Sequence, residues 1–172
     1  MKEIVQDGAT VLRETAKLVP EELFGTPELA GIIKDMEDAL DPELEGVAIA
    51  APQIAIPYRI FVVRKDRTLA TPPEGTKLPI QNDVYINPEI VKTSRRRAHM
   101  DEGCLSVRGV YGTTYRHDRA TIRARNFDGS HFERGGGGLT AQIFQHEVDH
   151  LNGILFIDHA DRLVEISPTP DA

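Results

Sequence analysis

Hydrophobic side chains recur at helical spacing in one early segment of the chain. Between residues 27 and 40 they fall three and four positions apart, at Leu29, Ile32, Ile33, Met36 and Leu40. This spacing places them on one face of an α-helix. Thr26 and Pro27 provide a start signal, because Thr caps helices and Pro suits the first turn. Asp41-Pro42 ends the pattern, so we predict a helix over residues 27–40 that packs on the core.

Shorter segments combine apolar alternation with β-branched residues, which is typical of strands. Three segments are predicted strands: residues 59–63, 84–87 and 120–127. After the third, Asp128-Gly129 favours a tight turn into a further strand over residues 131–133. The proline-rich residues 71–79 predict a surface loop.

A second helix is predicted from Leu139 to Asn152, where the sequence LTAQIFQHEVDHLN contains neither proline nor glycine. Gly153 follows where a left-handed cap would end the helix. The four glycines at residues 135–138 predict a flexible segment before it. The same helix contains the pentapeptide HEVDH, which carries the most informative chemistry of the chain.

Two histidines and a glutamate in this helix favour a hydrolytic metal centre. Positions i and i+4 share a helix face, so His146 and His150 can bind one divalent ion with Glu147 beside it as a general base. A catalytic site needs a third protein ligand. Phe156 stands where the metzincin protease pattern has its third histidine, and Glu165 is the only later glutamate. An HExxH-type metallopeptidase remains an alternative, although neither the third histidine nor a well-placed later glutamate completes its ligand set.

The only cysteine of the chain offers the missing ligand. Cys104 lies in the segment EGCLS, residues 102–106, and a lone cysteine cannot form an intramolecular disulfide. Beside two histidines, a thiolate completes a Cys-His-His set. A further segment, GVAIAAPQ at residues 46–53, combines small residues with Gln53. Small residues let a substrate backbone come close, and a glutamine amide can donate to an oxyanion.

These three segments together resemble the motifs of the peptide deformylase family. The family carries GxGxAAxQ, EGCLS and QHExDH, and this chain has GVAIAAPQ, EGCLS and QHEVDH. The resemblance extends from VLRETAKLV near the start to HLNGILFID after the second predicted helix. It implies a metal-dependent hydrolase that removes the formyl group from N-terminal formylmethionine of nascent polypeptides and releases formate.

The resemblance also implies residue roles. It gives three ligands of one divalent metal per chain: Cys104, His146 and His150. Glu147 is implied as the catalytic acid and base, with Gln53 and the backbone N–H of Leu105 as oxyanion donors. Six further residues are expected to bind substrate: Val47, Ala48, Gly103, Leu139, Gln142 and Ile143. The family's natural metal is generally ferrous iron, and the same ligand set accepts zinc, nickel or cobalt.

Three positions depart from the family pattern. Ala48 replaces the second glycine of the first motif, and Arg108 follows CLSV where a proline is usual. Gln142 lies at a position that, by the resemblance, belongs to the family's apolar pocket for the methionine side chain. None of these changes removes a ligand, so we expect altered affinity rather than lost activity. A weakly active metal-binding homologue is a second alternative, favoured by Ala48 and Arg108.

Composition favours a compact enzyme. The 172 residues slightly exceed the common domain size, so we predict one catalytic domain over residues 1–172, with residues 166–172 as a frayed tail. A net charge of −7 disfavours direct reading of nucleic acid. The N-terminus lacks an apolar signal region and no apolar run could cross a membrane, so a cytoplasmic location is expected. The basic run at residues 95–97 favours a solvated strand or turn, and a transient ribosome contact stays open.

The predicted elements combine into an α+β fold. Mixed or antiparallel strands should surround a central metal-binding helix, with the N-terminal helix packed outside. Because metal-binding histidines need outer hydrogen-bond partners, we predict a Glu102–Arg116 pair near the site. The remaining histidines are expected to be solvated or singly hydrogen-bonded: His99, His117, His131 and His159.

Overall fold

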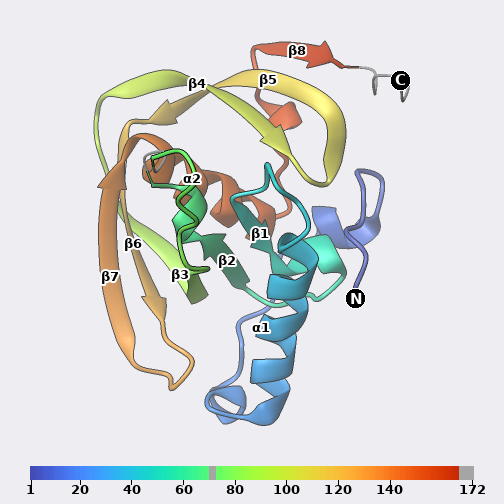
Figure 1. The fold of residues 1–172 in the computed structure, drawn as a ribbon, viewed down its shortest axis with the longest axis vertical. Helices are drawn as coiled ribbons and strands as arrows, with labels where there is room; N and C mark the ends of the chain where they lie inside the picture. Colours follow the sequence, from blue (N-terminus) through green and yellow to red (C-terminus); the bar gives the residue numbers. More distant parts are fainter. Residues whose placement is uncertain (70–72, 167–172) are drawn as a thin grey trace.

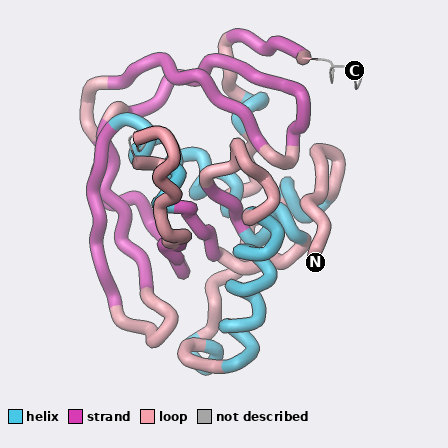
Figure 2. The backbone as a smooth tube through the Cα atoms, viewed as in Figure 1, coloured by secondary structure: helices cyan, strands magenta, loops and turns pink. Residues whose placement is uncertain are grey.

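The computed structural model describes residues 1–69 and 73–166, and these residues form the predicted α+β fold with two sheets and two α-helices (Figures 1 and 2). The larger sheet has the order β1-β2-β3-β6-β7: Ala48–Ala50, Ile60–Arg64, Asn82–Thr93, Arg119–Arg125 and His131–Gly137. The smaller sheet has the order β4-β5-β8: Arg97–Cys104, Val107–His117 and Arg162–Glu165. All pairings within the two sheets are antiparallel. Five short 3-10 helices, η1 to η5, connect these elements: Thr10–Arg13, Glu21–Leu23, Ala51–Ile54, Lys65–Arg67 and Phe156–Asp158.

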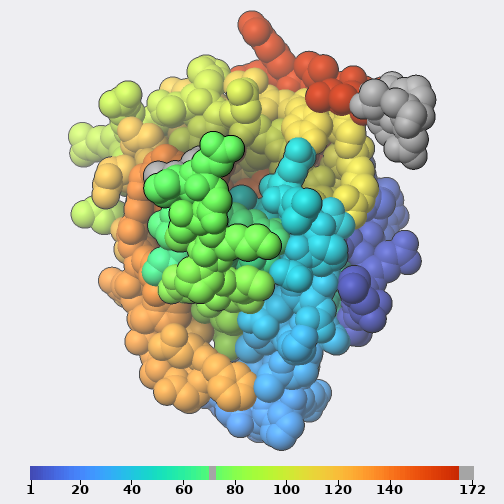
Figure 3. Space-filling view, viewed as in Figure 1, coloured from blue at the N-terminus to red at the C-terminus, as the bar shows by residue number. Residues whose placement is uncertain are grey.

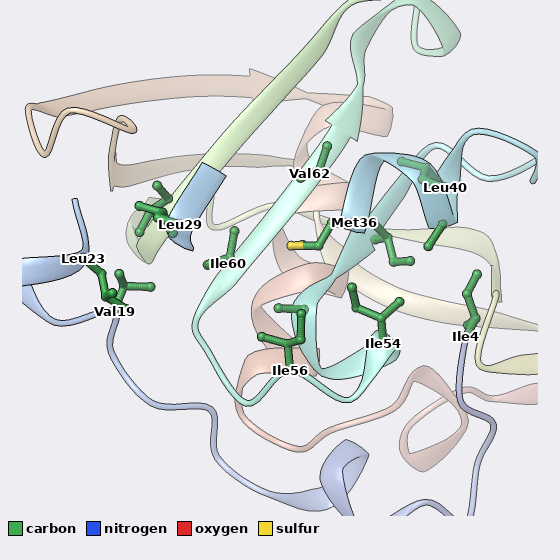
Figure 4. Close-up of a cluster of buried hydrophobic side chains, with 14 residues drawn as sticks. Ile4, Val19, Leu23, Leu29, Met36, Leu40, Ile54, Ile56, Ile60 and Val62 are labelled. Carbon is green, nitrogen blue, oxygen red and sulfur yellow. The ribbon is translucent and has the colours of Figure 1, made fainter. Parts of the chain in front are cut away.

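The first helix, α1, spans Pro27–Leu40 as the sequence predicted. The Thr26 hydroxyl accepts a hydrogen bond from the N–H of Leu29 at 3.3 Å, which supplies the N-cap. Figure 4 shows side chains of its apolar face among those of β2 and the segments around it. Leu29, Met36 and Leu40 are fully buried there, and burying each such side chain stabilises the fold by roughly 1.5–3 kcal/mol.

The second helix, α2, spans Gly138–Leu151 and contacts strands of both sheets. Its central place follows from buried aromatic packing, because the ring of Phe144 meets the ring of Tyr85 edge-on at a centroid distance of 5.4 Å. Gly153 ends the helix region with a φ of 74°. A Cβ at this position would lie 2.5 Å from the carbonyl oxygen of Arg13, so both the backbone conformation and the close approach require glycine.

The strand predictions are confirmed in position but not in length. The predicted strand over residues 84–87 is only part of the first half of β3, and the hairpin from β6 into β7 forms around Gly129. The predicted flexible glycines are wrong, because residues 135–137 pair with residues 119–121 inside β7. A Cβ on Gly136 would lie 2.6 Å from Thr140 Cγ2, so the missing side chain lets this strand approach the first turn of α2. The hairpin of β4 and β5 was not predicted.

Two loop predictions fall partly outside the described residues. Of the predicted surface loop, residues 73–79 are described and mostly exposed, whereas residues 71–72 are not described. Of the predicted tail, only Ile166 is described, and its N–H donates to the carbonyl of Gly109 at 2.7 Å. In the described part of the chain, none of the helices combines the length and the apolar character needed to span a membrane.

The loop between α1 and β1, residues 41–47, is fixed by one side chain. The guanidinium of Arg67 donates to four backbone carbonyls at 2.7 to 3.3 Å: Leu40, Asp41, Glu43 and Gly46. Arg64 adds an ion pair with Asp41 at 2.7 Å. Carbonyls at a helix C-terminus have no partner within the helix. The carbonyls of Leu40 and Glu43 already accept from the backbone N–H groups of Glu43 and Gly46, and Arg67 adds a charged donor to all four.

Replacing Arg67 with Ala should therefore destabilise the fold. We expect the free energy of unfolding to fall by about 1–3 kcal/mol, because several carbonyls lose a charged donor, and urea denaturation measures it. Arg67→Lys should recover part of the loss, since an ammonium keeps the charge without the planar fork. The exposed Arg123 provides the control variant, Arg123→Ala. Equal stability of the Arg67→Ala and Arg123→Ala proteins would contradict the role of Arg67.

Candidate active site

A cavity of about 660 Å³ opens between three segments of the chain. Its walls come from the α1–β1 loop with β1, from the hairpin of β4 and β5, and from the first turns of α2. Figure 3 shows the surface hollowed where atoms of the α1–β1 loop approach those of the β4–β5 hairpin. All residues that the sequence indicated as site residues line this cavity except His150, which is 1% exposed. The three motifs, far apart in the sequence, thus converge.

Three potential ligand atoms cluster at the inner end of the cavity, two of them from residues that line it. The side-chain ligand atoms of Cys104, His146 and His150 all lie within 4.8 Å of one another, and Cys104 Sγ is 3.3 Å from His150 Nε2. An ion at tetrahedral bond lengths of about 2.0–2.3 Å would hold sulfur and nitrogen about 3.5 Å apart. The donor chemistry and the spacing therefore fit a divalent ion. Among the described residues this is the one such cluster, and Glu165 is not part of it.

A buried carboxylate connects this cluster to both strands of the hairpin. Glu102 Oε1 lies 2.5 Å from His146 Nδ1. Arg116 donates to both oxygens of Glu102, at 2.5 and 2.8 Å, and the Thr114 hydroxyl donates at 2.6 Å. A third donor of Arg116 reaches Asp149 at 3.0 Å. The predicted Glu102–Arg116 pair is confirmed, and it holds the His146 ring with its Nδ1 engaged.

The environment shifts the pKa of four ionisable groups in and around the cluster. Burial lowers the pKa of His146, but hydrogen bonds to Cys104 and Glu102 outweigh it and leave the pKa well above its usual value. Burial lowers the pKa of His150 well below its usual value, which favours the neutral imidazole that binds metals. Burial also raises the pKa of Glu147 to about 7. Burial raises the pKa of Glu102 as well, but the hydrogen bonds from Arg116 and His146 outweigh it and leave the pKa below its usual value. Glu102 is thus a fixed anion, whereas Glu147 can exchange a proton near neutrality.

Glu147 and Gln53 line the same cavity. Among the described residues, Glu147 Oε2 is buried without a hydrogen-bond partner, which is unusual for a buried polar atom. Gln53 lies in η3, directly after β1, and its Oε1 accepts from the N–H of Ala50 at 2.9 Å. Its Nε2 lies 3.1 Å from Ser106 Oγ and 3.7 Å from Cys104 Sγ. The amide donor therefore faces the ligand cluster.

Two departures from the family pattern make contacts at the cavity that the sequence did not indicate. Gln142 Nε2 donates to the carbonyl of Asp101 at 2.7 Å, which ties α2 to β4. Arg108 forms a bidentate ion pair with Glu43 across the cavity wall, at 2.8 and 3.1 Å. These two residues are 65 positions apart, so no local pattern could have indicated the pair.

The histidines outside the motif follow the expected pattern. His117 Nδ1 lies 2.7 Å from the carbonyl oxygen of Ser94, and His99 is largely exposed beside Tyr115. His159 Nε2 lies 3.4 Å from Asp149 Oδ2. Phe156, at the third-histidine position of the metzincin pattern, is 1% exposed and packs its ring near that of His146. It belongs to the core around the cluster.

Comparisons with known proteins agree in one family. The family model described as Polypeptide deformylase matches residues 1–165. Peptide deformylase of Latilactobacillus sakei is 38% identical over 174 residues, covering 94% of this chain and 91% of that protein. Peptide deformylase of Carboxydothermus hydrogenoformans is 37% identical over 161 residues, covering 94% of each. A crystal structure of class I type b peptide deformylase from Acinetobacter baumannii with Met-Ala-Ser bound has 32% identity and a TM-score of 0.79, covering 92% of this chain and 99% of that one.

The buried network generates a stability prediction. Glu102→Gln removes the charge opposite Arg116, whose side chain is 5% exposed, and we expect the free energy of unfolding to fall by about 3 kcal/mol. Chemical denaturation of metal-free protein measures this loss. Glu133→Gln, at a half-exposed pair with Arg123, is the matched control and should change stability little. Similar losses in the two variants would show that the Glu102 network contributes no more than a surface pair.

Proposed function

The chain belongs to the polypeptide deformylase family, and from this premise we propose how its residues carry out the family's reaction. The enzyme is a metal-dependent hydrolase that removes the N-formyl group from nascent polypeptides. One observation carries the assignment of roles: Cys104 and His146 of the ligand cluster line the same cavity as Glu147, whose Oε2 is buried without a hydrogen-bond partner among the described residues.

Cys104, His146 and His150 are the proposed ligands of one divalent cation per chain. A bound cation at this site supplies Lewis acidity, which polarises the formyl oxygen and makes water easier to deprotonate. Ferrous iron is the proposed natural metal, with zinc, nickel or cobalt as substitutes, because a mixed thiolate and imidazole set accepts all of them. Glu102 holds the His146 ring through Nδ1, which leaves Nε2 as the ligand atom.

Glu147 is the proposed proton carrier. Its carboxylate takes a proton from the attacking water and returns it to the leaving amine nitrogen as the C–N bond breaks. The Gln53 amide and the backbone N–H of Leu105 donate to the oxygen of the formyl group as negative charge develops there. A pKa of about 7 for Glu147 in the absence of metal suits both proton transfers, and a cation beside it would favour the carboxylate form.

The rest of the cavity is the proposed substrate site. Val47, Leu139 and Ile143 supply apolar surface for the methionine side chain, with Gln142 beside them. Ala48 and Gly103 line the approach of the peptide backbone. The Acinetobacter baumannii relative with Met-Ala-Ser bound supports a peptide as the ligand class. Formyl-Met nascent chains are therefore the proposed substrates. A cytoplasmic location and a transient ribosome contact are proposed with them, because nascent chains emerge from ribosomes there.

The two alternatives make different claims about Cys104 and about turnover. An HExxH-type metallopeptidase is not favoured, because the described residues supply Cys104 rather than a downstream histidine or glutamate to the cluster, and the family is a deformylase family. A weakly active metal-binding homologue would differ from an active deformylase in its rate of formate release. Formate release from formyl-Met-Ala-Ser by anaerobically purified protein, alongside metal analysis, tests the proposed function directly.

Replacing Glu147 with Gln should strongly reduce turnover while the metal stays bound. The amide matches the carboxylate in size but cannot carry the proton, so we expect kcat to fall by about 10²–10⁴-fold. Formate release and metal content are measured on the same preparations. Glu133→Gln, far more exposed, is the control. Turnover at the parental rate in the Glu147→Gln enzyme would remove Glu147 from the mechanism.

Replacing Cys104 with Ala should remove the metal as well as the activity. Only two protein ligands would remain, so we expect substoichiometric metal after exposure to a mild chelator that leaves the parent loaded. Elemental analysis measures the metal, and the formate assay measures turnover. A Cys104→Ala protein with full occupancy and full activity would indicate a different third ligand and revive the metallopeptidase alternative.

A further inference from the structure

The N-terminal segment, residues 4–7, lies against both elements that carry the proposed oxyanion donors. The N–H of Val5 donates to the carbonyl of Gln53 at 2.8 Å, and the N–H of Asp7 donates to the carbonyl of Ser106 at 2.7 Å. Figure 1 places this part of the chain beside the end of the β4–β5 hairpin. One short segment thus binds the backbone of η3 and the backbone of the hairpin turn at the same time.

The side chain of Gln6 spans this turn from the outside. Its Nε2 donates to the carbonyl of Leu105 at 2.9 Å, and its Oε1 accepts from the N–H of Arg108 at 3.3 Å. A carboxamide can donate and accept at once, which suits it to a bridge between a carbonyl and an N–H. Gln6 is exposed, so its contribution is these hydrogen bonds rather than the packing of a core.

The turn that Gln6 spans is short, and its backbone conformation sets the direction of the Leu105 N–H, the proposed oxyanion donor. Cys104 pairs with Val107, so Leu105 and Ser106 are the two turn residues and their peptide planes set the direction of the Leu105 N–H. From the cavity side, Gln53 Nε2 donates to Ser106 Oγ at 3.1 Å. The turn is therefore held from two sides, by Gln53 within the site and by Gln6 and Asp7 outside it.

We propose that Gln6 is a positioning residue for deformylation. By bridging the Leu105 carbonyl and the Arg108 N–H, it holds the Leu105 N–H and the Gln53 amide in one mutual arrangement around the oxyanion position. Donors that are fixed before the reaction need no reorganisation as charge develops. This inference rests on the roles proposed above for Gln53 and Leu105, and it adds a residue that touches neither substrate nor metal.

The experiment compares three metal-loaded variants with the parent enzyme. Gln6→Ala removes both hydrogen bonds to the turn, together with a longer one from Gln6 Nε2 to the Ile4 carbonyl at 3.4 Å. Gln6→Glu keeps the acceptor but loses the donor to the Leu105 carbonyl. Glu3→Ala is the control, because Glu3 is exposed just before this segment and makes no side-chain hydrogen bond within the described residues. The measurements are kcat and KM for formyl-Met-Ala-Ser, metal content, and amide hydrogen exchange of residues 105–108 and of α2.

We expect kcat of Gln6→Ala to fall by about 3- to 10-fold, the range for losing one or two neutral hydrogen bonds, while KM stays within about twofold. Exchange at residues 105–108 should quicken, and exchange in α2 and the metal content should not change. Gln6→Glu should lose at least as much kcat, because a carboxylate then faces the Leu105 carbonyl. Glu3→Ala should match the parent.

Three results would overturn the inference. Unchanged kcat and unchanged amide exchange at residues 105–108 in Gln6→Ala would show that the turn keeps its conformation without Gln6. A rise in KM alone would make Gln6 a substrate contact, and loss of metal or faster exchange in α2 would make its role structural. If the parent enzyme itself released no formate, the proposed function would fail, and the exchange comparison would still decide whether Gln6 holds the turn.

Discussion

The buried carboxylate of Glu102 is the constraint on which the site depends. Its side chain is 3% exposed, and removing a carboxylate from water costs several kcal/mol unless its partners replace the lost hydration. Arg116 on β5, Thr114 on β5 and His146 on α2 supply those partners together. These three partners reach Glu102 only when β4 and β5 pair in the observed register and α2 lies across the hairpin. Because residues i and i+2 of a strand share a face, the same arrangement brings Cys104 to the histidines.

Two glutamates in the site have opposite environments, and this separates their roles. Glu102 accepts hydrogen bonds from cationic and neutral donors that hold its pKa low, so it cannot exchange a proton near neutrality. Glu147 is buried, one of its oxygens has no hydrogen-bond partner in the described part of the chain, and burial raises its pKa to about 7. Carboxylates whose environments push their pKa values apart are how enzymes assign fixed charge and proton transfer to the same residue type. The structure therefore supports Glu147, rather than Glu102, as the proposed proton carrier.

The sequence could predict what local pattern determines. Both helices follow from apolar spacing and terminal signals, and the three motifs indicate the ligands because their chemistry is readable residue by residue. The β4–β5 hairpin was missed because its glycines disfavour a strand locally, whereas Gly112 is required by the approach of β8: a Cβ there would lie 2.7 Å from the carbonyl oxygen of Arg162. The Arg108–Glu43 pair and the Gln6 bridge join distant residues, so no spacing along the chain encodes them.

The distribution of the proposed roles explains why those distant contacts exist. The proposed ligands lie on α2 and at the end of β4, which are regular secondary-structure elements, whereas the proposed oxyanion donors lie in η3 and in a two-residue turn. Loops open more readily than core elements, yet a functional group must keep its geometry to within a fraction of an ångström. Side chains outside the motifs hold these loops by hydrogen bonds and ion pairs. Arg67 holds the α1–β1 loop, the Arg108–Glu43 pair joins the two sides of the cavity, and Gln6 holds the turn. The chemistry is carried by the motifs, and its precision depends on side chains that belong to none of them.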